Sequence, residues 1–262
     1  MRSLIALAVG LYPTILGAQV PRPPFYADTA PSALRSDLVF PASRQPHVPR
    51  WWEAASLAGF TLAVMTQDEG TTDEIREHPT RAAADLASVF RRAGQPEVYA
   101  ALPVAIVTTG LLAGNGRIAR AGGRLAASVV LSTAAFETLK LASGRARPDA
   151  GEGAWRFSPF SGNSSLPSGH STVAFALATS LSHELHNPVA TVALYTAAAG
   201  TAWSRIYDQR HWASDVVFGA ALGIASAEVA HGHWRIFGIR PPALILEHGG
   251  AGVQLAVPLT TH

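Results

Sequence analysis

The chain of 262 residues contains no cysteine, and only 15% of its residues are charged. Without thiols it can form no disulfide framework, no thiolate zinc site and no cysteine nucleophile. Its formal net charge of +2 is too small to indicate a nucleic-acid partner, and lysine and arginine form no long basic run. Ala, Val and Leu dominate the middle of the chain, which favours tightly packed helices or a membrane neighbourhood.

The amino terminus has the pattern of an export signal. Arg2 precedes an apolar run from Leu4 to Ile15, and the small residues before Gln19 suit cleavage by signal peptidase. The run is too short to span a bilayer comfortably. We therefore interpret residues 1–18 as a signal peptide, with a buried helix as the alternative, and expect an exported protein of the periplasm or cell envelope.

Three further regions follow the signal. Prolines recur throughout residues 19–50, and we expect a disordered, extended arm there because proline fixes φ and blocks helix formation. Residues 51–235 favour an all-α, antiparallel bundle of about six to seven helices. Residues 236–262 form a tail in which 243–247 and 253–257 are typical of two short strands around a glycine turn.

Helices are expected at residues 51–67, 72–92 with a kink at Pro79, 97–112, 118–142, 167–186, 189–203 and 212–231. Thr71 or Thr72 could cap the second helix. Ser168 is close enough to the start of the fifth to help cap it. Residues 143–166 exceed an ordinary connection, and loops of that length are usually functional.

Charged side chains occur where the later helices end or begin. The fourth helix ends near Lys140, the fifth begins near His170, the sixth ends near Arg205 and the seventh begins near His211. Short connections make antiparallel neighbours, so these four points fall at one end of the bundle. The residues expected to converge there are Lys140, Arg147, His170, Arg205, His211 and Asp215.

His211 and Asp215 stand one turn apart if the last helix begins near Trp212. The Asp215 carboxylate could then accept the Nδ1 proton of His211 and leave Nε2 with a free lone pair. A solvated helix start is the alternative explanation of this pair. The surrounding cations indicate that the pair belongs to a site.

A pocket with three cations favours a dianion such as phosphate. Arg147 and Arg205 suit bidentate contacts with its oxygens, and Lys140 supplies a point charge. The N–H groups around Ser168 and Gly169 would add the anion site of a helix start.

Two histidines in the same pocket indicate catalysis rather than binding alone. His211 could attack phosphorus while His170 protonates the leaving oxygen and later activates water. Because no cluster of carboxylates suggests a magnesium site, we expect hydrolysis without a metal or other cofactor.

Three segments resemble the signature motifs of the type 2 phosphatidic acid phosphatase and vanadium haloperoxidase superfamily. They are Lys140 with Arg147-Pro148, then Pro167-Ser168-Gly169-His170, then Ser204-Arg205 with His211 and Asp215. The resemblance implies a helical bundle, a phosphohistidine on His211, orientation of that ring by Asp215, and His170 as the acid. It also implies that phosphate is held by Lys140, Arg147, Ser168, Gly169 and Arg205.

Several alternatives stay open at the level of sequence. The chain could be a haloperoxidase, in which the vanadate cofactor would use similar ligands. It could also be a catalytically silent envelope protein that binds anions. The substrate could be a lipid phosphate, such as phosphatidic acid or isoprenyl diphosphate, or a small soluble phosphoester. The oligomeric state is not predicted.

Membrane placement is equally open. The apolar segments are nearer fifteen residues than the ~20 of a full span. Arg117, Arg120 and Arg124 would suit a cytoplasmic loop, which places the active end on the exported side.

Other histidines are interpreted as structural. His183 and His186, three residues apart, could bind a metal, but a helix end facing water is the favoured explanation. His231 and His233 suit the dipole at a helix end.

Overall fold

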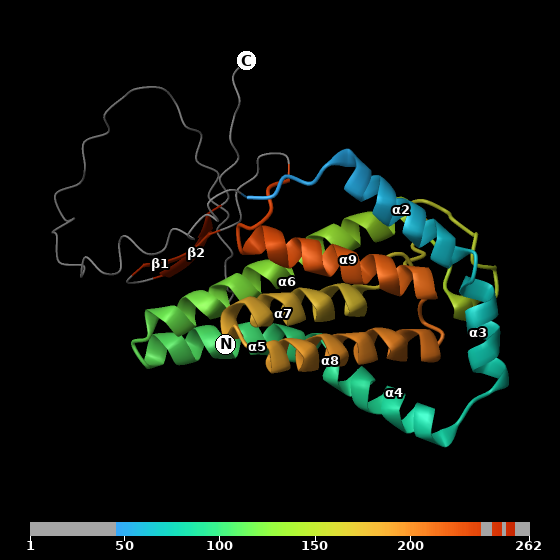
Figure 1. Cartoon of the computed structure of the whole chain (residues 1–262), viewed down its shortest axis with the longest axis horizontal. Helices are drawn as coiled ribbons and strands as arrows, with labels where there is room; N and C mark the ends of the chain where they lie inside the picture. The colour runs from blue at the N-terminus through green and yellow to red at the C-terminus, as the bar shows by residue number, and fades with distance from the viewer. Residues whose placement is uncertain (1–45, 237–242, 248–249, 255–262) are drawn as a thin grey trace, which may run out of the picture.

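The computed structural model describes residues 46–236, 243–247 and 250–254, and helices fill most of it (Figure 1). The helices are α2 Trp51–Met65, α3 Asp68–Glu77, α4 Arg81–Ala93, α5 Pro96–Leu112, α6 Gly116–Ser143, α7 Gly169–Leu185, α8 Pro188–Tyr207 and α9 Ala213–Ala230, with a short 3-10 turn, η1, at Pro148–Ala150. The predicted all-α bundle is confirmed. The expected signal at 1–18 and arm residues 19–45 lie outside the described residues.

One predicted helix is two in the structure. The segment expected at 72–92 is divided between α3 and α4, because a residue before proline is pushed out of the α-helical conformation and His78 precedes Pro79. Thr80 then caps α4, and its Oγ1 accepts a hydrogen bond of 3.2 Å from the N–H of Ala83. Because α3 begins at Asp68, the cap expected at Thr71 or Thr72 is wrong.

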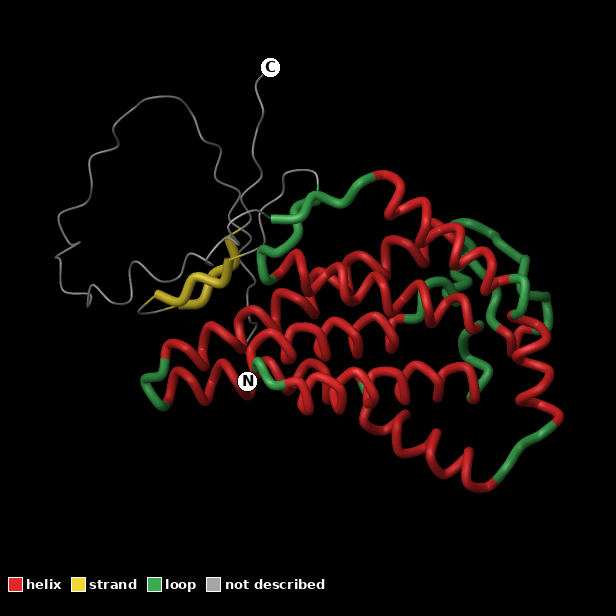
Figure 2. Tube along the Cα trace, in the orientation of Figure 1, coloured by secondary structure: helices red, strands yellow, loops and turns green. Residues whose placement is uncertain are grey.

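Helix α7 lies in the centre of the bundle and contacts α6, α8 and α9 (Figure 2). Leu125 and Phe136 of α6 pack there against Val173 and Leu177 of α7. On the other side α9 approaches closely, because a Cβ on Gly223 would lie 2.1 Å from the carbonyl oxygen of Thr172. Only glycine permits this approach, which packs the middle of α9 against the start of α7.

The long helices run up and down, so the ends of α6 and α8 and the starts of α7 and α9 lie at one end of the bundle, beside α3 (Figure 1). The connection from α6 to α7 also lies at that end and includes η1 and a bridge between Arg145 and Phe157. The fold thus gathers the charged segments named above.

The opposite end of the bundle holds the last part of the proline-rich arm. The N–H of His47 donates to the carbonyl oxygen of His233 at 2.7 Å. In return, the N–H of Arg235 donates to the carbonyl oxygen of His47 at 2.9 Å. Residues 46–50, predicted as part of a disordered arm, are therefore docked beside the residues that follow α9 because their backbone groups pair there.

A β-hairpin follows in the tail, as predicted. Strand β1, Ala243–Glu247, pairs antiparallel with β2, Gly250–Gln254. The first strand has the expected bounds, whereas the second begins at Gly250 instead of residue 253. The glycines taken for the turn pair within the ladder, because Gly250 lies opposite Glu247.

Candidate active site

His211 lies just before α9 and is only 4% exposed. Its Nδ1 lies 2.8 Å from the backbone carbonyl oxygen of Ser165 and 3.8 Å from Oδ2 of Asp215. A carbonyl can only accept, so Nδ1 carries the proton and Nε2 keeps its lone pair. The expected tautomer is present, but the expected acceptor is different: Ser165 receives the hydrogen bond in place of Asp215.

Asp215 positions His211 indirectly, through Ser165. Its Oδ2 accepts hydrogen bonds from Oγ of Ser165 at 2.5 Å and from the N–H of Trp212 at 2.9 Å. The second bond caps the start of α9 with the carboxylate of its own first turn. Asp215 thereby fixes Ser165, and the carbonyl of Ser165 fixes the imidazole of His211.

Arg145 balances the charge of Asp215 in the interior. Its side chain is fully buried, and one guanidinium nitrogen lies 2.6 Å from Oδ1 of Asp215 while the other lies 2.8 Å from Oδ2 of Asp68. Remaining donors reach Oγ of Ser214 at 2.7 Å and the carbonyl oxygen of Ala154 at 2.7 and 2.9 Å. A buried charge is tolerated only with such pairing, so α3, the long loop and α9 are joined at this side chain.

The cations predicted to hold phosphate lie around the two histidines. His170 interacts electrostatically with Lys140, Arg147, Arg205 and His211. These residues come from α6, the long loop, α8 and the start of α9. The structure therefore brings together, at one end, side chains that the sequence separates by more than sixty residues.

Burial and positive charge act together on His170. Desolvation is the larger cause and the nearby Arg205 cation is the next, and they lower the pKa of His170 to about 4. Burial also lowers the pKa of His211. Both rings are therefore neutral at pH 7 in the protein without an anion, which leaves a nucleophilic lone pair on His211.

Lys140 is held at the end of α6 by two contacts. Its Nζ lies 3.7 Å from Oε1 of Glu137 and 4.7 Å from the ring centroid of Phe136. The same ring allows little space near Gly169, where a Cβ would come within 3.0 Å of it. Phe136 therefore helps fix the position of the Lys140 ammonium group and limits the space at Gly169, the first residue of α7.

The start of α7 differs in detail from the expectation. The side chain of Ser168 makes no capping hydrogen bond, although it occupies the N-cap position. Its backbone N–H donates to the carbonyl oxygen of Asp215 at 3.0 Å, so this N–H is committed within the protein. The N–H groups of the first turn, beginning at Gly169, have no partner inside the helix and point from its N-terminus.

The residues before His211 fasten the rim of the site. Asp208 accepts two hydrogen bonds from Arg91 of α4, at 2.8 and 2.9 Å. Gln209 accepts one from Arg76 of α3 at 2.9 Å, and Arg210 donates to Asp149 of η1 at 2.7 Å. The polar residues 208–210 thus tether the rim of the site to α3, α4 and η1.

Sequence reasoning missed Arg145, Asp68, Ser165 and Ser214. Arg145 falls between the motif residues Lys140 and Arg147, and Asp68 falls between the first two expected helices. A charged residue so close to two motif cations is a signal for Arg145. No local pattern identifies Asp68, because its partner Arg145 is 77 residues away.

A comparison with protein families matches the part of the chain that carries the motifs. Residues 121–236 match the model of the PAP2 superfamily. The lipid A 1-phosphatase of Porphyromonas gingivalis is 43% identical over 97 residues, which are 36% of this chain and 19% of that protein. The lipid A 1-phosphatase of Rhizobium johnstonii is 39% identical over 107 residues, 39% of this chain and 43% of that protein. The matches thus span less than half the length of these curated relatives.

Two solved structures have a similar fold. The crystal structure of Aquifex aeolicus LpxE matches with a TM-score of 0.50 and 22% identity, covering 62% of this chain and 93% of that one. The transmembrane PAP2 type phosphatidylglycerolphosphate phosphatase of Bacillus subtilis matches with a TM-score of 0.55 and 20% identity, covering 69% and 95%. The motifs and the family model lie on the same helices, and over residues 121–236 the chain is similar to the PAP2 superfamily.

Proposed function

We propose that this chain is a lipid phosphate phosphatase that works through a phosphohistidine on His211. One observation carries the proposal. Three of the four buried side-chain atoms without a hydrogen-bond partner in the described residues belong to the predicted phosphate ligands: Nε of Arg147, Nε of Arg205 and Oγ of Ser168. An unmade buried hydrogen bond costs about 1–3 kcal/mol, so such atoms are usually satisfied. Orphan donors beside two histidines fit a tetrahedral oxyanion.

The first step uses the lone pair on Nε2 of His211. It attacks phosphorus, and the bond from phosphorus to the leaving oxygen breaks as His170 gives that oxygen a proton. The leaving group departs as a free hydroxyl compound. Arg147 and Arg205, together with Lys140, balance the charge that spreads over the equatorial oxygens.

The second step returns the site to its starting state. His170, now neutral, takes a proton from water, and the water oxygen attacks the phosphohistidine. The bond between phosphorus and Nε2 of His211 breaks, the electron pair returns to nitrogen, and inorganic phosphate leaves. Asp215 and Ser165 hold the ring in one orientation through both steps.

His170 can be an acid only if it is protonated when substrate is bound. Its low pKa arises partly from the positive charges of Arg205, His211, Lys140 and Arg147. A phosphate dianion offsets these charges and so raises the pKa of His170. We therefore propose that the substrate itself promotes protonation of the acid.

The proposed reaction needs no metal ion. The pocket supplies positive charge through side chains, and the carboxylate of Asp215 is already engaged by Arg145, Ser165 and Trp212. Its oxygens serve to position His211.

We place the bundle in a membrane. Helices α6 and α9 are long and apolar enough to cross one, and only 22% of the apolar window of α6 is buried within the protein. Helix α5 also exposes large apolar side chains, including Val104 at 64% and Leu112 at 84%. A helix that is apolar and yet exposed suits contact with lipid. Arg117 and Arg120, at the end of α6 away from the pocket, support a cytoplasmic position for that end and an exported position for the pocket.

The substrate that fits this placement is a phosphorylated lipid whose headgroup enters the pocket. Two relatives that match more than a third of this chain are lipid A 1-phosphatases. We therefore propose the 1-phosphate of lipid A as the preferred substrate, ahead of phosphatidic acid, isoprenyl diphosphate and small soluble phosphoesters.

The test is phosphate release by the full chain, purified in detergent, from lipid A, phosphatidic acid, an isoprenyl diphosphate and p-nitrophenyl phosphate. We expect the highest kcat/KM with lipid A and no inhibition by EDTA. His211→Ala should abolish turnover and the acid-labile phosphoenzyme, whereas His170→Ala should slow turnover and still bind vanadate. A carbonate wash of membranes should leave the protein in the pellet.

The other outcomes each point elsewhere. Undiminished activity in His211→Ala would refute the nucleophile. Halide oxidation that depends on vanadate and peroxide would indicate a haloperoxidase. Phosphate binding without turnover of any substrate would indicate an anion-binding protein, and release of the protein by carbonate would contradict the membrane placement.

A further inference from the structure

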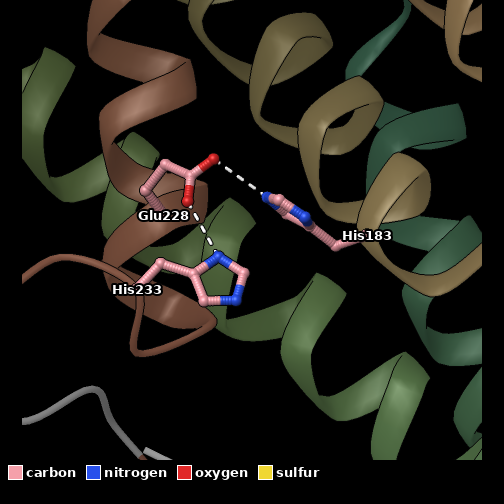
Figure 3. Close-up of side chains that lie close together, drawn as sticks. All are labelled: His183, Glu228 and His233. Atoms are coloured by element: carbon pink, nitrogen blue, oxygen red, sulfur yellow. Dashed lines mark hydrogen bonds and ion pairs between the residues drawn. The ribbon is translucent and has the colours of Figure 1, made fainter. Parts of the chain in front are cut away.

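Figure 3 shows a second cluster of ionisable side chains, His183, Glu228 and His233. It lies near the ends of α7 and α9, whereas the phosphate pocket lies at their starts. His183 is near the end of α7, Glu228 is near the end of α9, and His233 follows α9. Nε2 of His183 lies 2.9 Å from Oε1 of Glu228, and Nδ1 of His233 lies 2.9 Å from Oε2 of the same carboxylate. One nitrogen from each histidine and a carboxylate oxygen all lie within 4.8 Å of one another.

We propose that His183, Glu228 and His233 form a binding site for a divalent transition-metal ion, for which Zn²⁺ is the best probe. Two imidazoles and one carboxylate are a ligand set that Zn²⁺ uses with an open fourth position. Ligand atoms of a tetrahedral zinc site are roughly 3.3 Å apart, given bonds of about 2.0–2.1 Å. The two nitrogen-to-oxygen separations of 2.9 Å, each to a different oxygen of Glu228, would widen by a few tenths of an ångström. One ligand atom from each residue already lies within 4.8 Å of the others, and this spacing would close to roughly 3.3 Å around an ion.

The neighbouring ionisable side chains are engaged with other groups, which leaves His183, Glu228 and His233 as the proposed ligands. His231 lies beside them, but its Nε2 is 2.8 Å from Oγ of Ser180 and its Nδ1 is 3.8 Å from Glu184. Glu184 in turn accepts two hydrogen bonds from Arg124, at 2.5 and 2.7 Å. These groups are committed to each other and form the wall of the site.

The expectation for these histidines is therefore corrected. His183 does not face water together with His186: its side chain is 32% exposed and meets Glu228. His186 ends α7 in the left-handed conformation, and its Nδ1 lies 3.2 Å from the carbonyl oxygen of Glu184. His233 is directed at the carboxylate of Glu228 rather than at the helix dipole alone.

The position of the cluster gives the metal a structural role. His233 belongs to the segment whose carbonyl oxygen accepts the hydrogen bond from His47. An ion bound to α7, α9 and this segment would fasten residues 46–50 and 231–235 to the bundle. It lies at the opposite end from His211, so it takes no part in the hydrolysis.

The alternative is an ion-pair cluster in which both rings donate to Glu228 and no metal binds. The two states differ in their protons. Without metal, Nε2 of His183 and Nδ1 of His233 carry the protons that reach the carboxylate. A bound metal takes the lone pairs of those same nitrogens, so each ring must carry its proton on the other nitrogen.

The experiment is a titration of the full chain, stripped with a chelator and purified in detergent, with Zn²⁺ and separately with Mg²⁺. We expect binding of one Zn²⁺ and a higher Tm with Zn²⁺, while Mg²⁺, which prefers oxygen ligands, has no such effect. ¹⁵N NMR of the histidine rings should show the change of tautomer at His183 and His233.

Matched variants separate this site from adventitious binding. His183→Ala and His233→Ala should each weaken Zn²⁺ binding about tenfold or more, because a lost ligand costs at least as much as a lost outer-shell partner. His186→Ala, at the same helix end, should bind as the parent protein does. Far-UV circular dichroism checks that each variant is folded, and Glu228→Gln provides a variant that keeps the size of the side chain.

Two results would overturn the proposal: no Zn²⁺ binding by the parent protein, or equal binding by the parent and the folded His183→Ala variant. Hydrolysis of lipid phosphate is a separate measurement. A failed phosphatase assay therefore does not contradict the metal site, and absence of Zn²⁺ binding does not contradict the proposed phosphatase.

Discussion

Arg145 and Asp215 form an ion pair with a separation of 2.6 Å, and neither side chain is exposed. Arg145→Met should lower the free energy of unfolding by about 3–5 kcal/mol, because it leaves the carboxylates of Asp215 and Asp68 buried without their cation. Denaturation of the detergent-solubilised protein measures this. Arg156→Met is the control, since that residue is paired with Glu152 at the surface and should cost less than ~1 kcal/mol. Equal losses in the two variants would contradict the role of Arg145.

Asp68 and Asp215 share Arg145 but differ in what else they touch. Asp68→Asn and Asp215→Asn should both destabilise the protein. Only Asp215→Asn should also lower kcat, on the order of a hundredfold, because Asp215 positions Ser165 and hence His211, as outer-shell partners do at other sites. Steady-state kinetics at a temperature where both variants are folded decides this. Parallel losses of kcat would mean that Asp215 is only structural.

The pKa of His170 should rise when an oxyanion binds. Burial and the Arg205 cation lower it to about 4, and the anion removes the second cause. An NMR titration of the ring with and without vanadate measures the shift. His170→Asn, which removes the signal, confirms its assignment. An unchanged or lower pKa with vanadate would contradict the proposed protonation by substrate.

The same lowered pKa makes stability depend on pH. The unfolded ring titrates near 6.5 and the folded one at about 4, so the unfolded state binds more protons between these values. The contribution of His170 is fully present above pH 6.5 and is lost as the pH falls toward 4. Unfolding measured from pH 7 to pH 4 should show a smaller decline in His170→Asn than in the parent. An identical decline would show that other groups, such as His231, dominate.

Gly223→Ala should destabilise the bundle by about 1–3 kcal/mol, since its Cβ would lie 2.1 Å from the carbonyl oxygen of Thr172. It should also reduce turnover, because α7 and α9 carry His170 and Asp215. Gly59→Ala is the matched control: no atom lies within 4 Å of its Cβ, and alanine is the better helix former by about 1 kcal/mol. Thermal unfolding and kinetics of both variants test the pair. A harmless Gly223→Ala would show that α7 and α9 are free to separate.

Helices and their order could be predicted from the sequence because caps, prolines and apolar runs are local signals. The gathering of Lys140, Arg205 and His211 at one end followed from counting helix directions. The partner of the His211 ring could not be predicted, because a backbone carbonyl leaves no trace in residue identity. Spacing alone favoured Asp215, and the loop carrying Ser165 occupies that position instead.

The pairs of residues far apart in the sequence could not be predicted either. Asp68 meets Ser214, which lies 146 residues further along, and Glu228 meets His183 across 45 residues. Such contacts depend on how helices cross, which a single sequence does not specify. Pro79 shows a smaller failure of the same kind, because a kink and a complete break between α3 and α4 have the same local signal.

The tethers from residues 208–210 to α3, α4 and η1 hold the rim of the candidate site, which is distinct from the part that carries His170 and His211. Arg76 and Arg91 belong to helices that precede the motif-bearing half of the chain. Under the proposed function, replacement of Arg76 and Arg91 alone is therefore expected to alter which headgroups gain entry while the imidazoles of His170 and His211 stay in place. On that proposal, selectivity and chemistry can diverge independently.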